Sequence, residues 1–195
     1  MHFCTRDFLV PLCYICGMDD LVDIVDEHDE VIGTETRGKV HMAGLLHREI
    51  NIFFMTPRGE LIFQRRSMAK DSNPGLLCTA VSGHVDAGMK YEDTAVKEME
   101  EETGIKENIE NLIFLKKLKV NFDGGVLGTK NHAFKKVYAY IFRGDIRDLR
   151  VEPGEGAGFE ACMIDDFLNM DDEQRKKFTP TLRTKEFIEI VREMI

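Results

Sequence analysis

Four glutamates fall within the five positions from Glu98 to Glu102, and a glycine follows at position 104. Residues three and four apart share one face of a helix, so Glu98, Glu101 and Glu102 would converge there while Glu100 points toward solvent. Such like-charged neighbours oppose helix formation by about a few tenths of a kcal/mol per pair. A divalent cation removes this repulsion, and carboxylate oxygens are the ligands that Mg²⁺ and Mn²⁺ prefer. The cluster therefore predicts a metal site, with a solvated helix face as the alternative.

Residues on either side predict the elements that position this cluster. Segment 90–103 contains helix-forming residues without Pro or Gly, and Gly104 fits the end of a helix. Ala95 and Met99 lie four residues apart, which lets the helix pack against a sheet. Residues 76–83 form an apolar strand pattern, and a glycine-rich turn follows at 83–88. We therefore expect a strand, a turn and a helix that bring backbone groups close to the carboxylates.

The remaining pattern predicts one mixed α/β domain. Residues 21–33 alternate apolar and acidic side chains around a polar turn, which is typical of a hairpin. The strongest strand pair is 50–55 with 61–63, joined by a turn that contains Pro57 and Gly59. Further strands are expected at 112–120 and 134–144, a loop or helical turn at 36–50, and helices at 165–178 and 179–195, the last opening near Thr179 and Pro180. Strands interspersed with few helices favour a layered α/β fold.

Composition limits the setting and the partners of the protein. The 195 residues carry a formal net charge of −9, which disfavours binding to a nucleic-acid polymer. Five cysteines at irregular spacing do not form a disulfide pattern, and no apolar run is long enough to span a membrane. We therefore expect a reduced, cytoplasmic protein. Residues 1–17, which include the isolated C-x-x-C of Cys13 and Cys16, are predicted to be an N-terminal extension to a single domain at 18–195.

The turn and the acidic helix together resemble the Nudix box, whose form is G-x5-E-x7-R-E-U-x-E-E-x-G-U with U a bulky apolar residue. The agreement extends over twenty-three residues and comprises Gly83, Glu98, Met99, Glu101, Glu102, Gly104 and Ile105. The resemblance implies a Nudix-type α/β/α sandwich with a mixed β-sheet. It also implies hydrolysis, with Mg²⁺ or Mn²⁺, of a diphosphate linkage in a nucleoside diphosphate derivative or a related small phosphorylated molecule.

Two positions depart from the box. Met89 stands where the family has its first Glu, and Lys97 stands where it has Arg. In the family these two side chains are thought to order the loop and the helix. Because both are changed together, no carboxylate is left without its partner. Lys97 still offers a positive charge to Glu98 or to a phosphate, but not the two-pronged hydrogen bonding of Arg.

The resemblance also assigns roles to individual residues. Glu98, Glu101 and Glu102 would hold the ions, and Lys97 would join them in catalysis. One of the glutamates, or a carboxylate of a later loop such as Glu155 or Glu160, would take the proton. Further candidates are Ser82 and Glu155 as metal ligands, Arg65, Arg66 and His84 as contacts to substrate phosphates, and Asp86 as a metal ligand or a turn cap. For the arginines, the loop acids and His84, a solvated or structural role is the alternative.

The wider sequence is similar to the isopentenyl diphosphate isomerase branch of the same superfamily. Those isomerases use a cysteine before a Gly-His pair, metal-binding histidines and an E-x-E pair in a later strand. Here Ser82 stands at the cysteine position before Gly83 and His84. His41 and His47 lie upstream, and the later strand has no E-x-E. A serine hydroxyl cannot supply the proton chemistry of a thiol at neutral pH, which favours a hydrolase. An isomerase and a non-catalytic Nudix-fold binding module are the alternatives, and a homodimer is one assembly open to the chain.

Overall fold

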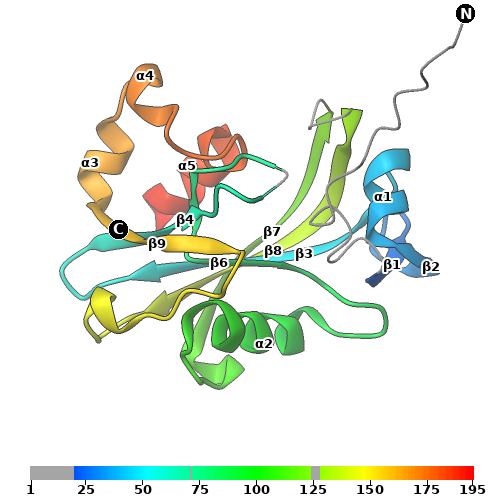
Figure 1. The fold of residues 1–195 in the computed structure, drawn as a ribbon, viewed down its shortest axis with the longest axis horizontal. Coiled ribbons are helices and arrows are strands. Elements are labelled where there is room, and N and C mark those ends of the chain that lie inside the picture. The colour runs from blue at the N-terminus through cyan, green and yellow to red at the C-terminus, as the bar shows by residue number, and fades with distance from the viewer. Residues whose placement is uncertain (1–19, 71, 124–127) are drawn as a thin grey trace, which may run out of the picture.

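The computed structural model describes residues 20–70, 72–123 and 128–195, so the predicted extension at 1–17 lies outside the described residues. Within them, seven strands form one mixed sheet in the order β5-β4-β3-β8-β7, with β6 paired to β3 and β9 to β4 (Figure 1). Strands β3 and β8 run parallel, and the other neighbours run antiparallel. The strands are β3 (His47–Met55), β4 (Glu60–Arg66), β5 (Leu77–Thr79), β6 (Val81–His84), β7 (Leu112–Asp123), β8 (Lys130–Ile141) and β9 (Gly156–Met163).

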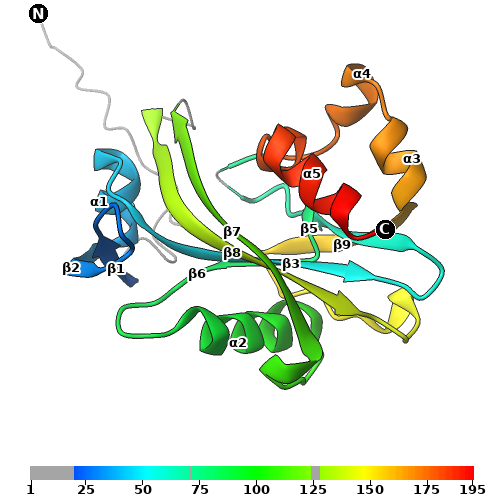
Figure 2. The same ribbon diagram turned by 180° about the vertical axis from the view of Figure 1, so that it is seen from behind.

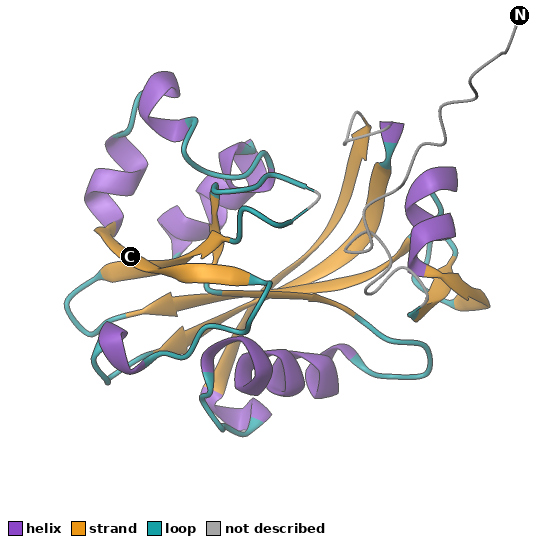
Figure 3. Cartoon of the chain, viewed as in Figure 1, coloured by secondary structure: helices purple, strands orange, loops and turns teal. Residues whose placement is uncertain are grey.

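Helices lie on both sides of this sheet, which confirms the predicted α/β/α sandwich (Figures 1, 2 and 3). The acidic helix α2 (Tyr91–Thr103) covers one face, and α3 (Ile164–Asn169), α4 (Asp172–Arg175) and α5 (Lys185–Glu193) lie on the other side. Strand alternation produces the two layers. Along β3, Ile52 belongs to the core under α2 with Met99, whereas Phe53 belongs to the core under α5 with Phe187. In the described ranges, no helix is long and apolar enough to cross a membrane.

Some segments differ in detail from the sequence-based expectation. The apolar run 76–83 forms two short strands, because β5 pairs with β4 whereas β6 pairs with β3. Segment 36–50 contains a true helix, α1 (Arg37–Ala43). The C-terminal helix begins at Lys185, where Thr184 caps it by accepting a hydrogen bond from the Phe187 N–H. Segment 165–178 divides into α3 and α4, since Asp171 starts α4 with a capping box to Gln174.

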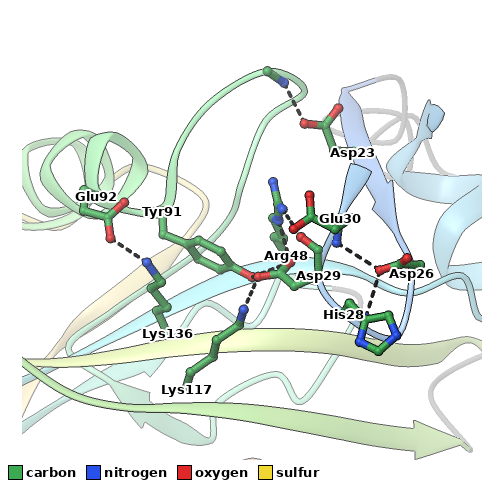
Figure 4. A network of polar contacts seen from close by, with 11 residues as sticks. Asp23, Asp26, His28, Asp29, Glu30, Arg48, Tyr91, Glu92, Lys117 and Lys136 are labelled. Carbon is green, nitrogen blue, oxygen red and sulfur yellow. Dashed lines mark hydrogen bonds and ion pairs between the residues drawn. The ribbon is translucent and has the colours of Figure 1, made fainter. Parts of the chain in front are cut away.

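The predicted hairpin forms a separate two-stranded sheet, β1 (Leu21–Val25) with β2 (Val31–Thr36). Figure 4 shows how its turn is fixed to the main body. Asp29 accepts hydrogen bonds from Arg48 Nε at 2.6 Å and from the Tyr91 hydroxyl at 3.0 Å, and it pairs with Lys117. Burial raises the pKa of Asp29, but the bonds from Lys117, Arg48 and Tyr91 outweigh it and lower that pKa. One buried carboxylate thus joins the hairpin to β3, β7 and the start of α2.

Candidate active site

The close approach of β6 to α2 fixes the first carboxylate of the acidic helix. A Cβ atom added at Gly83 would lie 2.5 Å from Glu98 Cδ, so only glycine lets the Glu98 side chain lie against this strand. Glu98 is largely buried there, and burial raises the pKa of its carboxyl to about 7. Gly104 ends the helix in the left-handed conformation, with φ of 75° and its N–H donating to the Glu100 carbonyl.

Glu102 is the most buried of the three glutamates, with 4% of its surface exposed. Its Oε2 accepts hydrogen bonds from the Ser82 N–H at 3.3 Å and from Gln64 Nε2 at 3.4 Å. Burial, reinforced by the charge of Glu98, raises the pKa of Glu102 well above its usual value. Glu100 faces solvent, as predicted. Two neighbouring buried acids disfavour ionisation, and a divalent cation relieves that cost.

Lys97 lies among the carboxylates of the turn and the helix. Its ammonium nitrogen is 3.2 Å from Asp86 Oδ2, 3.7 Å from Glu98 Oε1 and 3.6 Å from Glu101 Oε2. Burial lowers the pKa of Lys97, but the hydrogen bond with Asp86 and the surrounding negative charges raise it overall. The ammonium group of Lys97 is therefore at ion-pair distance from all three carboxylates and lies nearest to that of Asp86.

The loop before β9 is fastened to the same end of α2. The Arg150 N–H donates to the Thr103 carbonyl at 2.9 Å, just beyond the acidic residues of the helix. At the other end of the loop, a Cβ atom at Gly156 would lie 3.1 Å from the Gln64 side chain, which itself donates to Glu102. Segment 150–156 thus runs from the end of α2 to the strand beneath Glu102.

Two acids of this loop differ in their surroundings. Burial, followed by the charges of Glu155 and Glu101, raises the pKa of Glu152. Glu155 instead accepts from Lys70 Nζ at 2.5 Å, so its charge is already paired. Sequence reasoning favoured Glu155 as the loop acid of the site. The structure adds Glu152, whose pKa is raised in part by the negative charge of Glu101 on the acidic helix. Among the described residues, Lys70 pairs with Glu155, and no cation lies at ion-pair distance from Glu152.

A second polar cluster lies on the opposite face of β3 and β6, since strand alternation turns Gly83 toward Glu98 and the next residue, His84, away from it. In the part of the chain that the structure describes, one group of metal-binding residue types has its potential ligand atoms within 4.8 Å of one another: His41, His47, Glu49 and His84. His41 Nε2 lies 2.8 Å from His84 Nε2. Glu49 Oε1 lies 3.3 Å from Nε2 of both His47 and His84.

The surroundings of His41 and His84 favour neutral imidazoles. Burial lowers the pKa values of His41 and His84, and neutral imidazole is the form that binds metals. Glu49 also pairs with Lys135 of β8. Sequence reasoning missed Glu49, although it lies two residues after His47 in a strand and therefore on the same face. The signal was a charged residue in β3 directly before its apolar run at 50–55.

Comparison with known proteins decides the family. Residues 45–182 match the family model described as NUDIX domain. The chain belongs to the Nudix family. An uncharacterised Nudix hydrolase of Clostridium acetobutylicum is 30% identical over 159 residues, which are 79% of this chain and 75% of the relative. An isopentenyl-diphosphate Delta-isomerase of Serratia proteamaculans is 29% identical over 128 residues, 65% of this chain and 69% of the relative. A crystal structure of a Deinococcus radiodurans protein superposes with a TM-score of 0.63 at 24% identity, covering 89% of this chain and 98% of that one.

The family assignment confirms the predicted class of enzyme, a Nudix pyrophosphohydrolase, and the predicted isomerase-like relatives. It also gives the two departures from the Nudix box a structural setting. Met89 packs against the hydrophobic core beneath α2, so it is not available as a polar partner. Lys97 takes Asp86, three residues earlier than the usual glutamate position, as its nearest carboxylate.

Strand alternation along β4 separates the two arginines that the sequence grouped as phosphate contacts. Arg66 shares the face of Gln64, which reaches Glu102. Arg65 lies on the other face, where its Nε donates to Glu160 Oε1 at 2.8 Å. The structure therefore brings Arg66 to the side of the Nudix glutamates and leaves both Arg65 and Glu160 on the opposite side.

Two further candidates also face away from the Nudix glutamates. The Ser82 side chain lies on the same face of β6 as that of His84, and only the Ser82 backbone N–H reaches Glu102. His84, expected near substrate phosphates at the Nudix box, is part of the histidine cluster. The reason is the two-residue repeat of β6, which continues to His84, one residue beyond the strand end that the sequence predicted at Gly83.

The burial of Glu98 predicts a pH-dependent stability difference. The pKa of the Glu98 carboxyl is higher in the folded chain than in the unfolded chain. As pH rises from about 4.5 to about 7, this buried carboxyl ionises, and the folded state loses the stability that it has when Glu98 is protonated. With a chelator present, Glu98→Gln should melt at nearly the same temperature as the unaltered chain at about pH 5, and several degrees higher at about pH 8. Mg²⁺ should remove this advantage by stabilising the unaltered chain. Thermal melts at both pH values check this, and a Tm difference that is independent of pH would contradict it.

Proposed function

We propose that this Nudix protein is a Mg²⁺-dependent hydrolase that cleaves a diphosphate linkage in a nucleoside diphosphate derivative or a related small molecule. The observation that carries the proposal is the setting of Glu98. Its side chain lies against Gly83, with Lys97 and Glu101 beside it and the buried Glu102 one turn further on. An acidic helix face that was merely solvated would not bury two of its three carboxylates.

The donor set supports a hard divalent cation. Glu98, Glu101 and Glu102 offer carboxylate oxygens, which suit Mg²⁺ or Mn²⁺ better than softer metals. When bound, the ion offsets the charge of the substrate phosphates and acidifies the attacking water. Gly83 and the hydrogen bonds from Ser82 and Gln64 orient the glutamates before substrate arrives.

Other residues of the chain have roles in binding and proton transfer. Glu152 is the proposed general base, because its raised pKa suits it to accept a proton and its charge is not already paired as that of Glu155 is. Arg66 lies on the same face of the sheet as Glu102, and its Nε donates to the Ser72 carbonyl at 2.9 Å. The guanidinium of Arg66 is the proposed phosphate contact. Arg65 has no part in this assignment.

A panel of nucleoside diphosphate derivatives, incubated with Mg²⁺ and followed by release of phosphate or nucleoside monophosphate, tests the proposal. We expect turnover of at least one member that stops when the ion is chelated. Saturable binding without turnover by any member would instead favour a non-catalytic binding module. This experiment does not test the cytoplasmic location, the homodimer or the division into 1–17 and 18–195, which stay predictions.

The histidine cluster favours a second candidate activity, isomerisation of isopentenyl diphosphate. His41, His47 and His84 with Glu49 make a donor set that suits a transition metal, and a relative is named as that isomerase. Against it stands Ser82, whose hydroxyl cannot replace a thiol in proton transfer at neutral pH. Incubation with isopentenyl diphosphate and Mn²⁺, followed by proton NMR, distinguishes the two: double-bond migration without phosphate release would support the isomerase.

A further inference from the structure

The turn between β6 and α2 is held in place by the separate hairpin. Asp86 forms a β-bridge with Val22, and the Gly88 N–H donates to Asp23 Oδ2 at 2.9 Å. Figure 4 shows Asp23 reaching this turn while Asp29 of the same hairpin lies beside Tyr91, the first residue of α2. The backbone of Asp86 is therefore fixed at a point outside the acidic helix.

The ammonium group of Lys97 lies nearest to Asp86 of this turn. That group is 3.2 Å from Asp86 but 3.6 and 3.7 Å from Glu101 and Glu98. An ammonium group and a divalent cation compete for the same carboxylate oxygens. Without the attraction of Asp86, the flexible Lys97 side chain would settle on Glu98 and Glu101 and oppose the entry of a metal ion.

We propose that Asp86 is a positioning residue, which holds the ammonium group of Lys97 closest to the turn and so weakens its competition with a divalent cation for Glu98 and Glu101. This role rests on the proposed function, because it requires the metal to bind at the glutamates. It makes the β1–β2 hairpin, through Val22 and Asp23, a determinant of metal affinity in the Nudix box.

A double-mutant cycle on the full chain tests the role, with Mn²⁺ affinity read by electron paramagnetic resonance. Asp86→Asn should weaken Mn²⁺ binding by about tenfold in the unaltered chain. In a Lys97→Met background the same substitution should change the affinity by less than about twofold, since the competing ammonium group is gone. Asp23→Ala, which removes the acceptor of the Gly88 N–H and so loosens the turn, should also weaken binding only when Lys97 is present. Glu100→Gln is the matched control, because it removes one charge from the same helix without touching Lys97.

The outcomes distinguish a failure of this positioning role from a failure of the proposed function. Equal weakening by Asp86→Asn in both backgrounds would mean that Asp86 acts as a ligand or by its charge alone, and would overturn the positioning role. Mn²⁺ binding that Glu98→Gln leaves unchanged would place the ion elsewhere, and would overturn both this role and the proposed function. Weakening confined to the chain that retains Lys97 supports the role.

Discussion

Replacing Glu102 with Gln should lower kcat by about a thousandfold while the fold is retained. Glu102 has 4% of its surface exposed, so few other groups can take over its contacts. Gln keeps the volume and can still accept a hydrogen bond from the Ser82 N–H, but it carries no charge with which to hold a cation. Because burial disfavours the ionised form of Glu102, the neutral side chain should leave Tm unchanged or raise it.

The control for this prediction is Glu100→Gln, which makes the same chemical change on the exposed side of α2. Its kcat should stay within about twofold of the unaltered chain, as is usual for surface changes. Steady-state kinetics with saturating Mg²⁺ and thermal melts of both variants provide the measurement. Near-normal turnover by Glu102→Gln would show that the carboxylate has no part in catalysis.

Gly83→Ala should be nearly as damaging, although it adds only a methyl group. The new carbon would lie 2.5 Å from Cδ and 2.6 Å from Cγ of Glu98, so the Glu98 side chain must move away from β6. A displacement of about 1 Å at a catalytic group can lower the rate by roughly a hundredfold. Because the displaced atoms are at the end of a flexible side chain, we expect only a small change in the free energy of unfolding.

Gly33→Ala is the matched control for this substitution. Gly33 lies in strand β2, and a Cβ there would meet only Ile24 Cδ1, at an ordinary 3.9 Å. That variant should keep both activity and stability. If Gly83→Ala retained full kcat, the close approach of Glu98 to the strand would not be needed for the reaction, and the geometry proposed for the site would be wrong.

The helix and its glutamates were predictable because they depend on local spacing alone. The positions of Glu98 and Glu102, one turn apart, follow from the helical repeat, and Gly104 signals where the repeat ends. The exposure of Glu100 follows from the same geometry. These features require no knowledge of which strands are neighbours.

The faces of the strands were less well predicted because the reading treated strand ends as loops. Arg65 and Arg66 are adjacent in a strand and must point to opposite faces, a consequence that the residue types alone conceal. The histidine cluster depends on the pairing of β6 with β3, which brings His84 opposite Glu49. Nothing in the local sequence specifies that pairing.

The contact between Asp86 and Lys97 could not be predicted for another reason. It depends on the hairpin at the start of the chain, whose strand β1 holds the turn after β6. Sequence reasoning identified the two changed positions of the Nudix box and expected that, because both are changed together, no carboxylate loses its partner. The structure shows that a carboxylate from a different position is the nearest partner of the lysine.

The most direct measurement is an anomalous difference map from a crystal of the full chain soaked in Mn²⁺. We predict a peak within coordination distance of carboxylate oxygens from Glu98, Glu101 and Glu102, with the ammonium group of Lys97 beside Asp86. A map in which manganese occupies the histidine cluster alone, while the three glutamates bind nothing, would contradict the assignment of this helix as the catalytic centre.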